Sequence, residues 1–269
     1  MSKIESKKAL ITGGASGIGK LMGLQLLQKG LATLVIWDVN ETLLQSTALE
    51  FKKMGYDVYI YLVDVMNTTQ VINTAALVKK EVGKIDILIN NAGIVVGKYF
   101  IDHTHEDIDK TMGINSNALM HITREFLGDM MQTKQGHIVN IASAAGMVSN
   151  PKLSVYVASK FAVIGWSDSL RLEMEKEKTN VKITTVTPFY ISTGMFDGVK
   201  SSMIPIVKPQ NAVNKIISGI ENDRLYVRMP GIVNWVYFVK GVLPARWFDT
   251  IVGKWFGMHA TMNEFKGRH

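Results

Sequence analysis

Short apolar runs alternate with helix-length segments along most of this chain. The runs are nearly continuous in apolar character, which is typical of parallel strands buried on both faces. They span residues 9–11, 33–37, 58–63, 85–89, 137–141 and 181–186, with a last run at 225–227. The helical segments span residues 18–29, 41–54, 68–82, 105–131 and 155–178. Because crossovers between parallel strands are right-handed, this alternation predicts an α/β fold with a doubly wound parallel sheet.

The length of the chain limits it to one large domain. Its 269 residues can bury a substantial core but leave little room for a second full domain. The composition changes only after Pro230, where Trp, Phe and Val become frequent. We therefore predict a main domain over residues 1–228 and an apolar, basic C-terminal extension over residues 229–269.

Composition excludes several classes of function. The chain contains no cysteine, which rules out disulfides, Cys-ligated zinc, iron–sulfur clusters and thiol catalysis. The histidines form no ligand cluster, and we expect no metal. The net charge of +7 is spread along the chain without a dense Lys/Arg block, so we expect no nucleic acid partner. Residues 1–8 are polar and no apolar run is long enough for a bilayer, which predicts a cytoplasmic protein.

A glycine-rich turn follows the first predicted strand and leads straight into the first predicted helix. It reads Thr12-Gly-Gly-Ala-Ser-Gly-Ile-Gly19. Glycines permit a tight turn and close approach of a ligand to the backbone, and the helix start offers free N–H groups to a pyrophosphate. The alternative, a plain loop, is disfavoured by this strand–turn–helix order and by an acidic residue that closes the second strand. The predicted cofactor-binding positions in the turn are Thr12, Gly13, Ser16, Gly17, Ile18 and Gly19.

That acidic residue is Asp38, 19 positions after Gly19. A carboxylate there can accept hydrogen bonds from the adenosine ribose, and it would repel the extra phosphate of NADP. No Lys or Arg follows Asp38 closely, and position 15 is Ala. We therefore predict NAD as the cofactor; the alternative is an exposed Asp at a strand end.

Tyr156 and Lys160 lie four residues apart in a predicted helix and so share one face. An ammonium group near a phenol favours the phenolate, so we expect the pKa of Tyr156 to fall from about 10, which suits a general acid or base. Such a pair alone is more often a surface pair. Ser143 strengthens the case, because it lies just past the run at 137–141, where ligands of open parallel sheets bind. Its hydroxyl can hydrogen-bond a substrate oxygen.

With these residues in view, the chain resembles the short-chain dehydrogenase/reductase family over roughly residues 6–228. The family's elements occur in order and spacing: Thr12-Gly-x-x-x-Gly-x-Gly19, Asn90-Asn-Ala-Gly93, Asn115, Ser143, Tyr156-x-x-x-Lys160 and Pro188. One departure is Phe189, which stands where the family usually has Gly after the proline. We expect this residue to reshape the substrate side of the nicotinamide pocket.

The resemblance implies a Rossmann-type fold and a role for each motif residue. Tyr156 would be the acid/base, Ser143 would orient the substrate oxygen, and Lys160 would bind the nicotinamide ribose and lower the pKa of Tyr156. Asn115 would hold a water in a proton relay behind Lys160. Further cofactor contacts would come from Asp64 and Val65 at the adenine, from Asn91, Ala92 and Gly93 along the cleft, and from Ile191 and Thr193 at the carboxamide.

Some of these residues have simpler interpretations without the family. Asn91 would belong to a turn at a strand end, and Asn115 would be a polar residue within a helix. Asp64 would be the N-cap of the helix that starts near Thr68.

The C-terminal extension carries an amphipathic pattern. Trp247, Phe248, Ile251, Val252, Trp255 and Phe256 recur every three to four residues, which predicts one apolar helix face, with Lys240, Arg246 and Lys254 interspersed. Aromatic residues flanked by cations suit a helix in a membrane interface. A lid over the substrate cavity and a homodimer contact are the alternatives, and the three roles are compatible with one another.

The extension and the Trp37-Asp38 pair also resemble the retinol dehydrogenase and 17-beta-hydroxysteroid dehydrogenase-like branch of the family. The expected function is therefore hydride transfer between NAD and the alcohol or carbonyl group of an apolar substrate, such as a steroid, a retinoid or a long-chain alcohol. A homodimer or homotetramer and peripheral membrane contact are also expected. Two alternatives stay open: a reductase of small polar carbonyl compounds, and a non-catalytic NAD-binding protein of the membrane surface.

Overall fold

A computed structural model describes residues 3–201, 203–255 and 257–267 of the chain. Its centre is a seven-stranded, all-parallel sheet with the strand order β3-β2-β1-β4-β5-β6-β7. The strands are β1 (Lys8–Thr12), β2 (Thr33–Asp38), β3 (Val58–Leu62), β4 (Ile87–Asn90), β5 (Gly136–Ile141), β6 (Val181–Pro188) and β7 (Tyr226–Met229). The strand order reverses direction between β1 and β4, where open parallel sheets form a ligand crevice. The predicted doubly wound α/β fold is confirmed.

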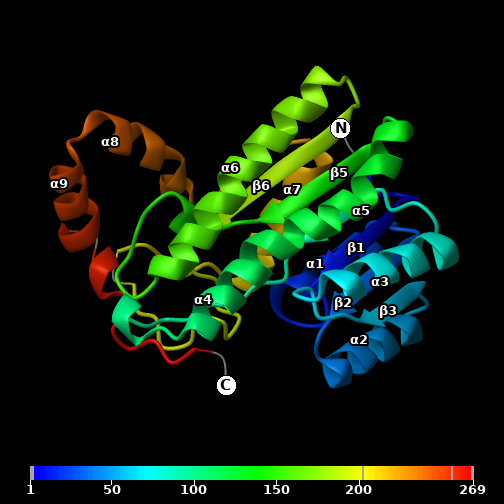
Figure 1. Cartoon of the computed structure of the whole chain (residues 1–269), viewed down its shortest axis with the longest axis horizontal. Coiled ribbons are helices and arrows are strands. Elements are labelled where there is room, and N and C mark those ends of the chain that lie inside the picture. The colour runs from blue at the N-terminus through cyan, green and yellow to red at the C-terminus, as the bar shows by residue number, and fades with distance from the viewer. Residues whose placement is uncertain (1–2, 202, 256, 268–269) are drawn as a thin grey trace.

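Helices cover both faces of the sheet (Figure 1). One face packs against α1 (Gly17–Gln28), α2 (Glu41–Lys53) and α7 (Pro209–Glu221). The other packs against α3 (Thr68–Glu81), α5 (Ala118–Gln132) and α6 (Ser154–Lys176). Burial on both faces explains why the central strands read as continuous apolar runs in the sequence.

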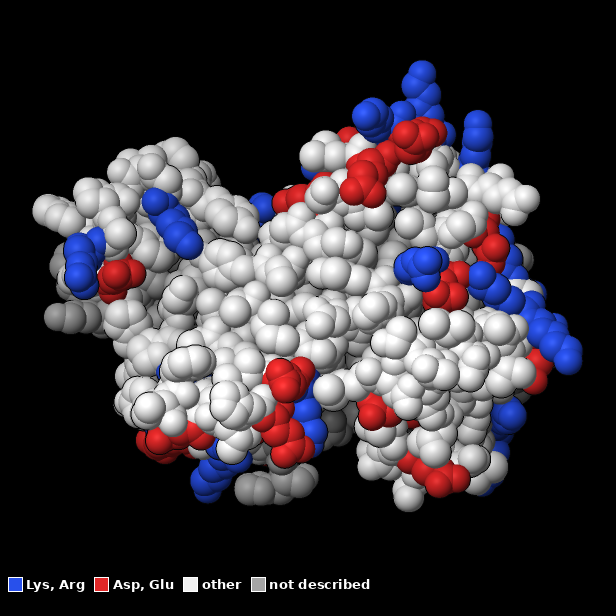
Figure 2. Space-filling model, viewed as in Figure 1, with Lys and Arg blue, Asp and Glu red and all other residues white. Residues whose placement is uncertain are grey.

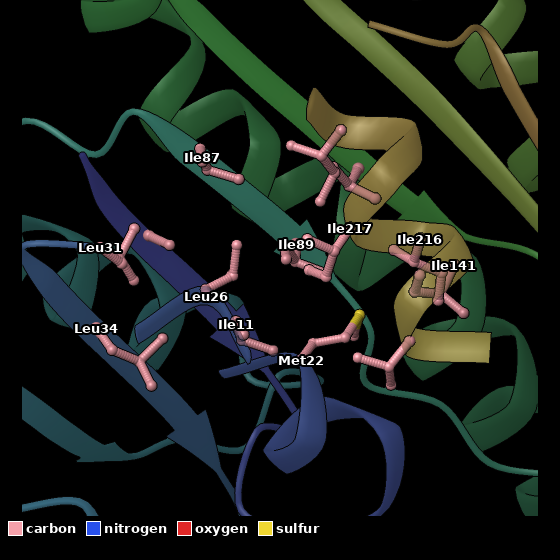
Figure 3. Packing of buried hydrophobic residues seen from close by; sticks show 14 of the residues in the cluster. Ile11, Met22, Leu26, Leu31, Leu34, Ile87, Ile89, Ile141, Ile216 and Ile217 are labelled. Atoms are coloured by element: carbon pink, nitrogen blue, oxygen red, sulfur yellow. The ribbon is translucent and has the colours of Figure 1, made fainter. Parts of the chain in front are cut away.

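The core on the first face is built by aliphatic side chains from the sheet and from two helices. Met22 and Leu26 of α1, Ile216 and Ile217 of α7 and Ile89 of β4 belong to one buried cluster, in which Ile217 lies beside Ile89 (Figure 3). All five side chains are fully buried. This packing holds α1 and α7 side by side on the sheet.

The structure differs from the sequence-based expectation at two helices. The segment 105–131 is interrupted: α4 (His105–Met112) passes into a π-helical turn, Gly113–Asn117, before α5 begins. The helix α7 was not predicted, although Pro209 at its first turn and its buried aliphatic side chains are typical of a helix.

After β7 the chain forms an arm at one end of the molecule (Figure 1). It comprises a 3₁₀ turn (Gly231–Trp235), α8 (Val236–Val242), α9 (Ala245–Phe248), a π-helical stretch (Asp249–Trp255) and a last 3₁₀ turn (Met258–Ala260). The predicted single apolar face is divided: Phe248 is buried whereas Trp247 is 67% exposed. This happens because Phe248 packs on the cluster that contains Tyr156. The side chains of Lys254, Trp255 and Phe256 lie outside the described residues.

Within the described residues, no helix combines the length and apolar character needed to cross a membrane.

Candidate active site

A cleft of about 280 Å³ opens at the carboxyl ends of the strands, beside the β1–β4 reversal point. It brings together residues from both halves of the sheet. The predicted residues that line it are Gly13, Ser16, Gly17, Ile18, Gly19, Asp38, Asp64, Val65, Asn91, Ala92, Gly93, Ser143, Tyr156, Lys160, Ile191 and Thr193. Thr12 and Asn115 were also predicted; both are buried behind the lining residues.

The glycine turn presents the start of α1 to this cleft. Gly17 has a φ of 54°, a backbone conformation that favours glycine. A Cβ on Gly19 would collide with the carbonyl oxygen of Gly13. Among the described residues, α1 has no side-chain cap and no acidic residue in its first turn. Its first N–H groups therefore remain available to an anionic group, and this cradle fits a pyrophosphate.

Thr12 and Asn91 fasten the turn to the end of β4. The Thr12 hydroxyl accepts hydrogen bonds from the backbone N–H groups of Asn91 and Ala92, both at 3.0 Å. The side-chain amide of Asn91 donates to the carbonyl oxygens of Thr12 and Gly13. Asn91 therefore joins two loops through its side chain. The alternative interpretation, a turn at a strand end, does not account for these side-chain bonds.

Asp38 is held at the cleft by two backbone hydrogen bonds. One carboxylate oxygen accepts from the N–H of Ala15 at 3.0 Å, and the other accepts from the N–H of Asn40 at 3.0 Å. A carboxylate has about four acceptor positions, so capacity remains for ribose hydroxyls. Lys20 of α1 forms an ion pair with Glu50 at 2.6 Å.

Asp64 and Val65 line the cleft beyond β3. The Asp64 carboxylate accepts a hydrogen bond from the backbone N–H of Met66. The interpretation of Asp64 as a helix N-cap is wrong, because Asn67 caps α3 through a bond from the N–H of Gln70. Asp64 is therefore left at the cleft instead of being used by the helix.

Ser143 and Tyr156 meet on the other side of the cleft. Ser143 follows β5, and its hydroxyl accepts from the N–H of Ala145 at 3.1 Å. Tyr156 lies in the first turn of α6 and is 5% exposed. The Ser143 hydroxyl lies 3.4 Å from the carbonyl oxygen of Pro188, and it is also near enough to the Tyr156 hydroxyl to lower the pKa of that phenol by hydrogen bonding. The two hydroxyl groups can therefore contact the same substrate oxygen.

Lys160 lies one turn after Tyr156 and is almost fully buried. Its ammonium nitrogen donates to the carbonyl oxygen of Ile141 at 2.9 Å and lies 5.7 Å from the centre of the Tyr156 ring. Burial lowers the pKa of Lys160 to about 8, because the charged form loses its hydration.

The expected fall in the pKa of Tyr156 is not what the protein alone produces. Burial raises this pKa, since a phenolate is poorly solvated in the apolar cluster around it. The hydrogen bond with Ser143 acts in the opposite direction and is weaker. Lys160 does not offset burial, because its ammonium group is bonded to a carbonyl rather than to the phenol.

Asn115 sits in the π-helical turn between α4 and α5 and is fully buried. Its side chain bonds both backbone groups of Ile94, accepting from the N–H at 2.8 Å and donating to the carbonyl at 2.9 Å. It also donates to the hydroxyl of Ser159 at 3.2 Å, next to Lys160 in α6. The turn is therefore anchored between the cleft wall and the helix that carries Tyr156, as π-bulges at functional sites often are.

Sequence reasoning missed most of the apolar side of the cleft. Ile94, Met195 and Phe196 line it together with Phe189, whose influence on the pocket was expected. The Phe196 ring stands edge-on to Tyr156, with 6.0 Å between the ring centres. No motif marks Phe196 in the sequence, because its position depends on how the loop after β6 folds.

The chain is similar to known proteins over most of its length. A family model described as short chain dehydrogenase matches residues 7–203. Epidermal retinol dehydrogenase 2 of Mus musculus is 38% identical over 264 residues, which covers 96% of this chain and 85% of the mouse protein. Estradiol 17-beta-dehydrogenase 11 of Macaca fascicularis is 33% identical over 256 residues, covering 91% and 85%.

A solved structure is also similar over most of the chain. The short chain dehydrogenase/reductase of Burkholderia phymatum, determined in complex with NAD, aligns with a TM-score of 0.82 at 25% identity. The alignment covers 90% of this chain and 95% of that one.

Proposed function

This chain belongs to the short-chain dehydrogenase family, and from that premise we propose that it transfers a hydride between NAD and an apolar alcohol or its carbonyl form. The membership makes it an oxidoreductase that uses a nicotinamide dinucleotide. The observation that carries the proposal is that the buried side chains of Ser143, Tyr156 and Lys160 line one cleft, with Lys160 one helical turn after Tyr156. A bound nicotinamide would supply the hydride acceptor or donor.

In the proposed mechanism, Tyr156 exchanges a proton with the substrate oxygen and Ser143 orients that oxygen. Because burial keeps Tyr156 protonated, it is ready to donate to a carbonyl during reduction. Oxidation of an alcohol requires the phenol to lose its proton first, which the bond from Ser143 favours. Lys160 would bind the nicotinamide ribose, and Asn115 would hold a water that passes protons toward Lys160.

NAD is proposed over NADP because of Asp38. Its negative charge beside the turn favours ribose hydroxyls and repels a phosphate ester. Asp64 and Val65 would contact the adenine, and Ile191 and Thr193 would contact the carboxamide. The turn residues from Thr12 to Gly19 would hold the pyrophosphate, with Asn91, Ala92 and Gly93 along the cofactor.

An apolar substrate is proposed from the lining beside Tyr156. Phe189, Met195 and Phe196 face the cleft, and such a wall gains free energy by removing hydrocarbon from water. Two relatives are a retinol dehydrogenase and an estradiol dehydrogenase, which act on substrates of this chemistry. A retinoid, a steroid or a long-chain alcohol would suit the wall.

The test is NADH formation from a panel of alcohols, with NADP in parallel. The panel holds retinol, steroid alcohols, long-chain primary alcohols and small polar alcohols. We expect turnover of apolar members with NAD. Turnover of small polar alcohols alone would contradict the proposed substrate class, and a preference for NADP would contradict the role of Asp38.

We also propose that the arm after residue 228 contacts a lipid surface. Trp235, Phe238 and Trp247 are each more than 60% exposed, and Val242 is 64% exposed. The lobe formed by the arm is mostly uncharged, with basic side chains and an acidic one on the face shown in Figure 2. Exposed aromatic residues with flanking cations suit the interface of an anionic membrane.

Co-sedimentation with vesicles of phosphatidylcholine and phosphatidylserine tests this contact. We expect Trp235→Ala combined with Trp247→Ala to reduce binding at least tenfold without changing NADH binding. The exposed Leu172, on α6, offers a matched control as Leu172→Ala. Equal binding of both variants would contradict the proposal. The family resemblance also supports a homodimer or homotetramer, which light scattering measures directly.

A further inference from the structure

We propose that residues 258–266, here called the closing segment, support the apolar wall of the substrate pocket from outside and that hydrogen bonds of the Thr261 hydroxyl hold them there. The inference rests on the proposed function and deepens it by naming a positioning residue for the substrate. It starts from a buried polar network that no step of the proposed chemistry uses. Thr261, Tyr190 and Asn150 form this network, and each is less than 8% exposed.

The hydrogen bonds of the network can be assigned completely at Thr261. Its hydroxyl donates to the carbonyl oxygen of Met258 at 2.9 Å. With that proton used, the Thr261 oxygen accepts from the Tyr190 hydroxyl at 3.0 Å and from the Asn150 amide at 2.9 Å. The same amide lies 3.2 Å from the Tyr190 oxygen. One threonine oxygen thus joins two distant parts of the chain in the protein interior.

These two partners belong to the loops that carry the catalytic groups. Asn150 lies in the connection from Ser143 to Tyr156, and its carbonyl accepts from the N–H of Leu153 just before α6. Tyr190 follows Pro188 and Phe189 at the end of β6. The hydrogen bonds of Thr261 to both loops therefore fix the position of the closing segment relative to the hydroxyl groups of Ser143 and Tyr156, which would hold the substrate.

The closing segment also contacts the loop after β6 through its backbone. The N–H of Lys200 donates to the carbonyl of Thr261 at 3.3 Å, and the N–H of Lys266 donates to the carbonyl of Asp197 at 2.9 Å. Lys200 forms an ion pair with Glu264 at 2.7 Å. The segment therefore holds the loop that contributes Met195 and Phe196 to the cleft.

Aromatic contacts link the closing segment to the side of the pocket where Tyr156 lies. Phe265 of the closing segment packs on Phe196, with 6.5 Å between ring centres, and it lies against Gly97 beyond β4. Phe196 in turn contacts Tyr190 at 5.0 Å and Tyr156 at 6.0 Å. The closing segment therefore touches the loops after β4, β5 and β6, and it packs behind the apolar residues that line the substrate side of the cleft.

The kinetic test compares Thr261→Val with Thr261→Ser, using a long-chain primary alcohol and NAD. Valine keeps the shape but removes the acceptor of two buried hydrogen bonds, whereas serine keeps the hydroxyl. We expect Thr261→Val to raise KM for the apolar alcohol about tenfold, with kcat and the NADH Kd within twofold of wild type. Thr261→Ser restores KM. The matched control is Thr111→Val, since the Thr111 hydroxyl is buried without a partner among the described residues.

A readout without turnover separates this inference from the proposed function. Hydrogen–deuterium exchange of the Lys200 and Lys266 amides reports whether the hydrogen bonds of Thr261 hold the loop, even if none of the alcohols is oxidised. We expect at least tenfold faster exchange at both amides in Thr261→Val, and wild-type exchange in β1 and β4. If that variant does not fold, Tyr190→Phe removes one of the two partner groups and is expected to change KM and exchange in the same direction, by about threefold, because the bond from Asn150 to Thr261 remains. Two results would overturn the inference. One is wild-type exchange at both amides in a folded Thr261→Val or Tyr190→Phe variant; the other is a rise of KM for the long-chain alcohol that is no larger than the rise for a small alcohol.

Discussion

The buried ammonium group of Lys160 donates a hydrogen bond to the carbonyl oxygen of Ile141 at 2.9 Å. Its pKa falls from 10.5 to about 8 because of burial. Between these two pH values the unfolded chain binds a proton that the folded protein does not. Stability must therefore rise with pH across this window, and it decreases as the pH falls toward 8.

Replacing Lys160 with Met removes this pH dependence. At about 1.4 kcal/mol for each pKa unit, the wild-type free energy of unfolding gains roughly 3 kcal/mol more than that of Lys160→Met between pH 8 and 10.5. Urea unfolding at several pH values measures both slopes, and other titrating groups cancel in the difference. Equal slopes would show that the lysine keeps its ordinary pKa in the fold.

Ser143→Ala changes the pH dependence of alcohol oxidation as well as its rate. The hydrogen bond from Ser143 lowers the pKa of Tyr156 against the effect of burial. Without this bond, the phenol loses its proton at higher pH. The rising limb of the plot of kcat against pH therefore shifts to higher pH. We expect kcat to fall about 100-fold near neutral pH. A lower kcat with an unmoved limb would leave Ser143 with an orienting role only.

Asp38→Asn tests the cofactor preference. The amide oxygen can still accept from the N–H of Ala15 in the turn, whereas the bond from the N–H of Asn40 is lost together with the negative charge. We expect the ratio of kcat/KM for NAD to that for NADP to fall about 100-fold, by weaker ribose binding and less phosphate repulsion. Asp57→Asn is the control, because Asp57 accepts from Thr33 away from the cleft. An unchanged ratio would show that Asp38 does not determine the preference for NAD.

Gly19→Ala weakens dinucleotide binding. The added methyl group would meet the carbonyl of Gly13 and the side-chain amide of Asn91, so the turn must open. We expect the Kd for NADH, measured by fluorescence titration, to rise at least tenfold. Gly165→Ala adds the same methyl group on α6, where nothing lies within 4 Å, and is expected to bind NADH normally. Similar Kd values for both variants would contradict the assignment of the turn.

The sheet and the cofactor half of the cleft could be predicted from the sequence because their signals are local. A strand buried on both faces has a continuous apolar run, and the turn from Thr12 to Gly19 is set by glycine conformations within eight residues. Tyr156 and Lys160 are neighbours by helical spacing alone. These features need no knowledge of distant contacts.

The substrate half depends on contacts between distant residues, which leave no pattern in the sequence. Thr261 meets Asn150 across 111 positions, and Phe265 meets Phe196 across the mouth of the pocket. The π-helical turn at Asn115 interrupts a helix whose apolar spacing is otherwise regular. The raised pKa of Tyr156 also follows from the cluster around it, not from the nearby lysine that the sequence makes visible.

The central claim is that the Tyr156 hydroxyl moves the proton that accompanies hydride transfer. Tyr156→Phe keeps the ring that packs beside Phe196 and removes only the hydroxyl. The direct measurement is kcat for NAD-dependent oxidation of the best apolar alcohol, together with the Kd for NADH, in this variant and in wild type. The account predicts a kcat at least 100-fold lower with a Kd within twofold of wild type. A variant that turns over at near wild-type rate would contradict it.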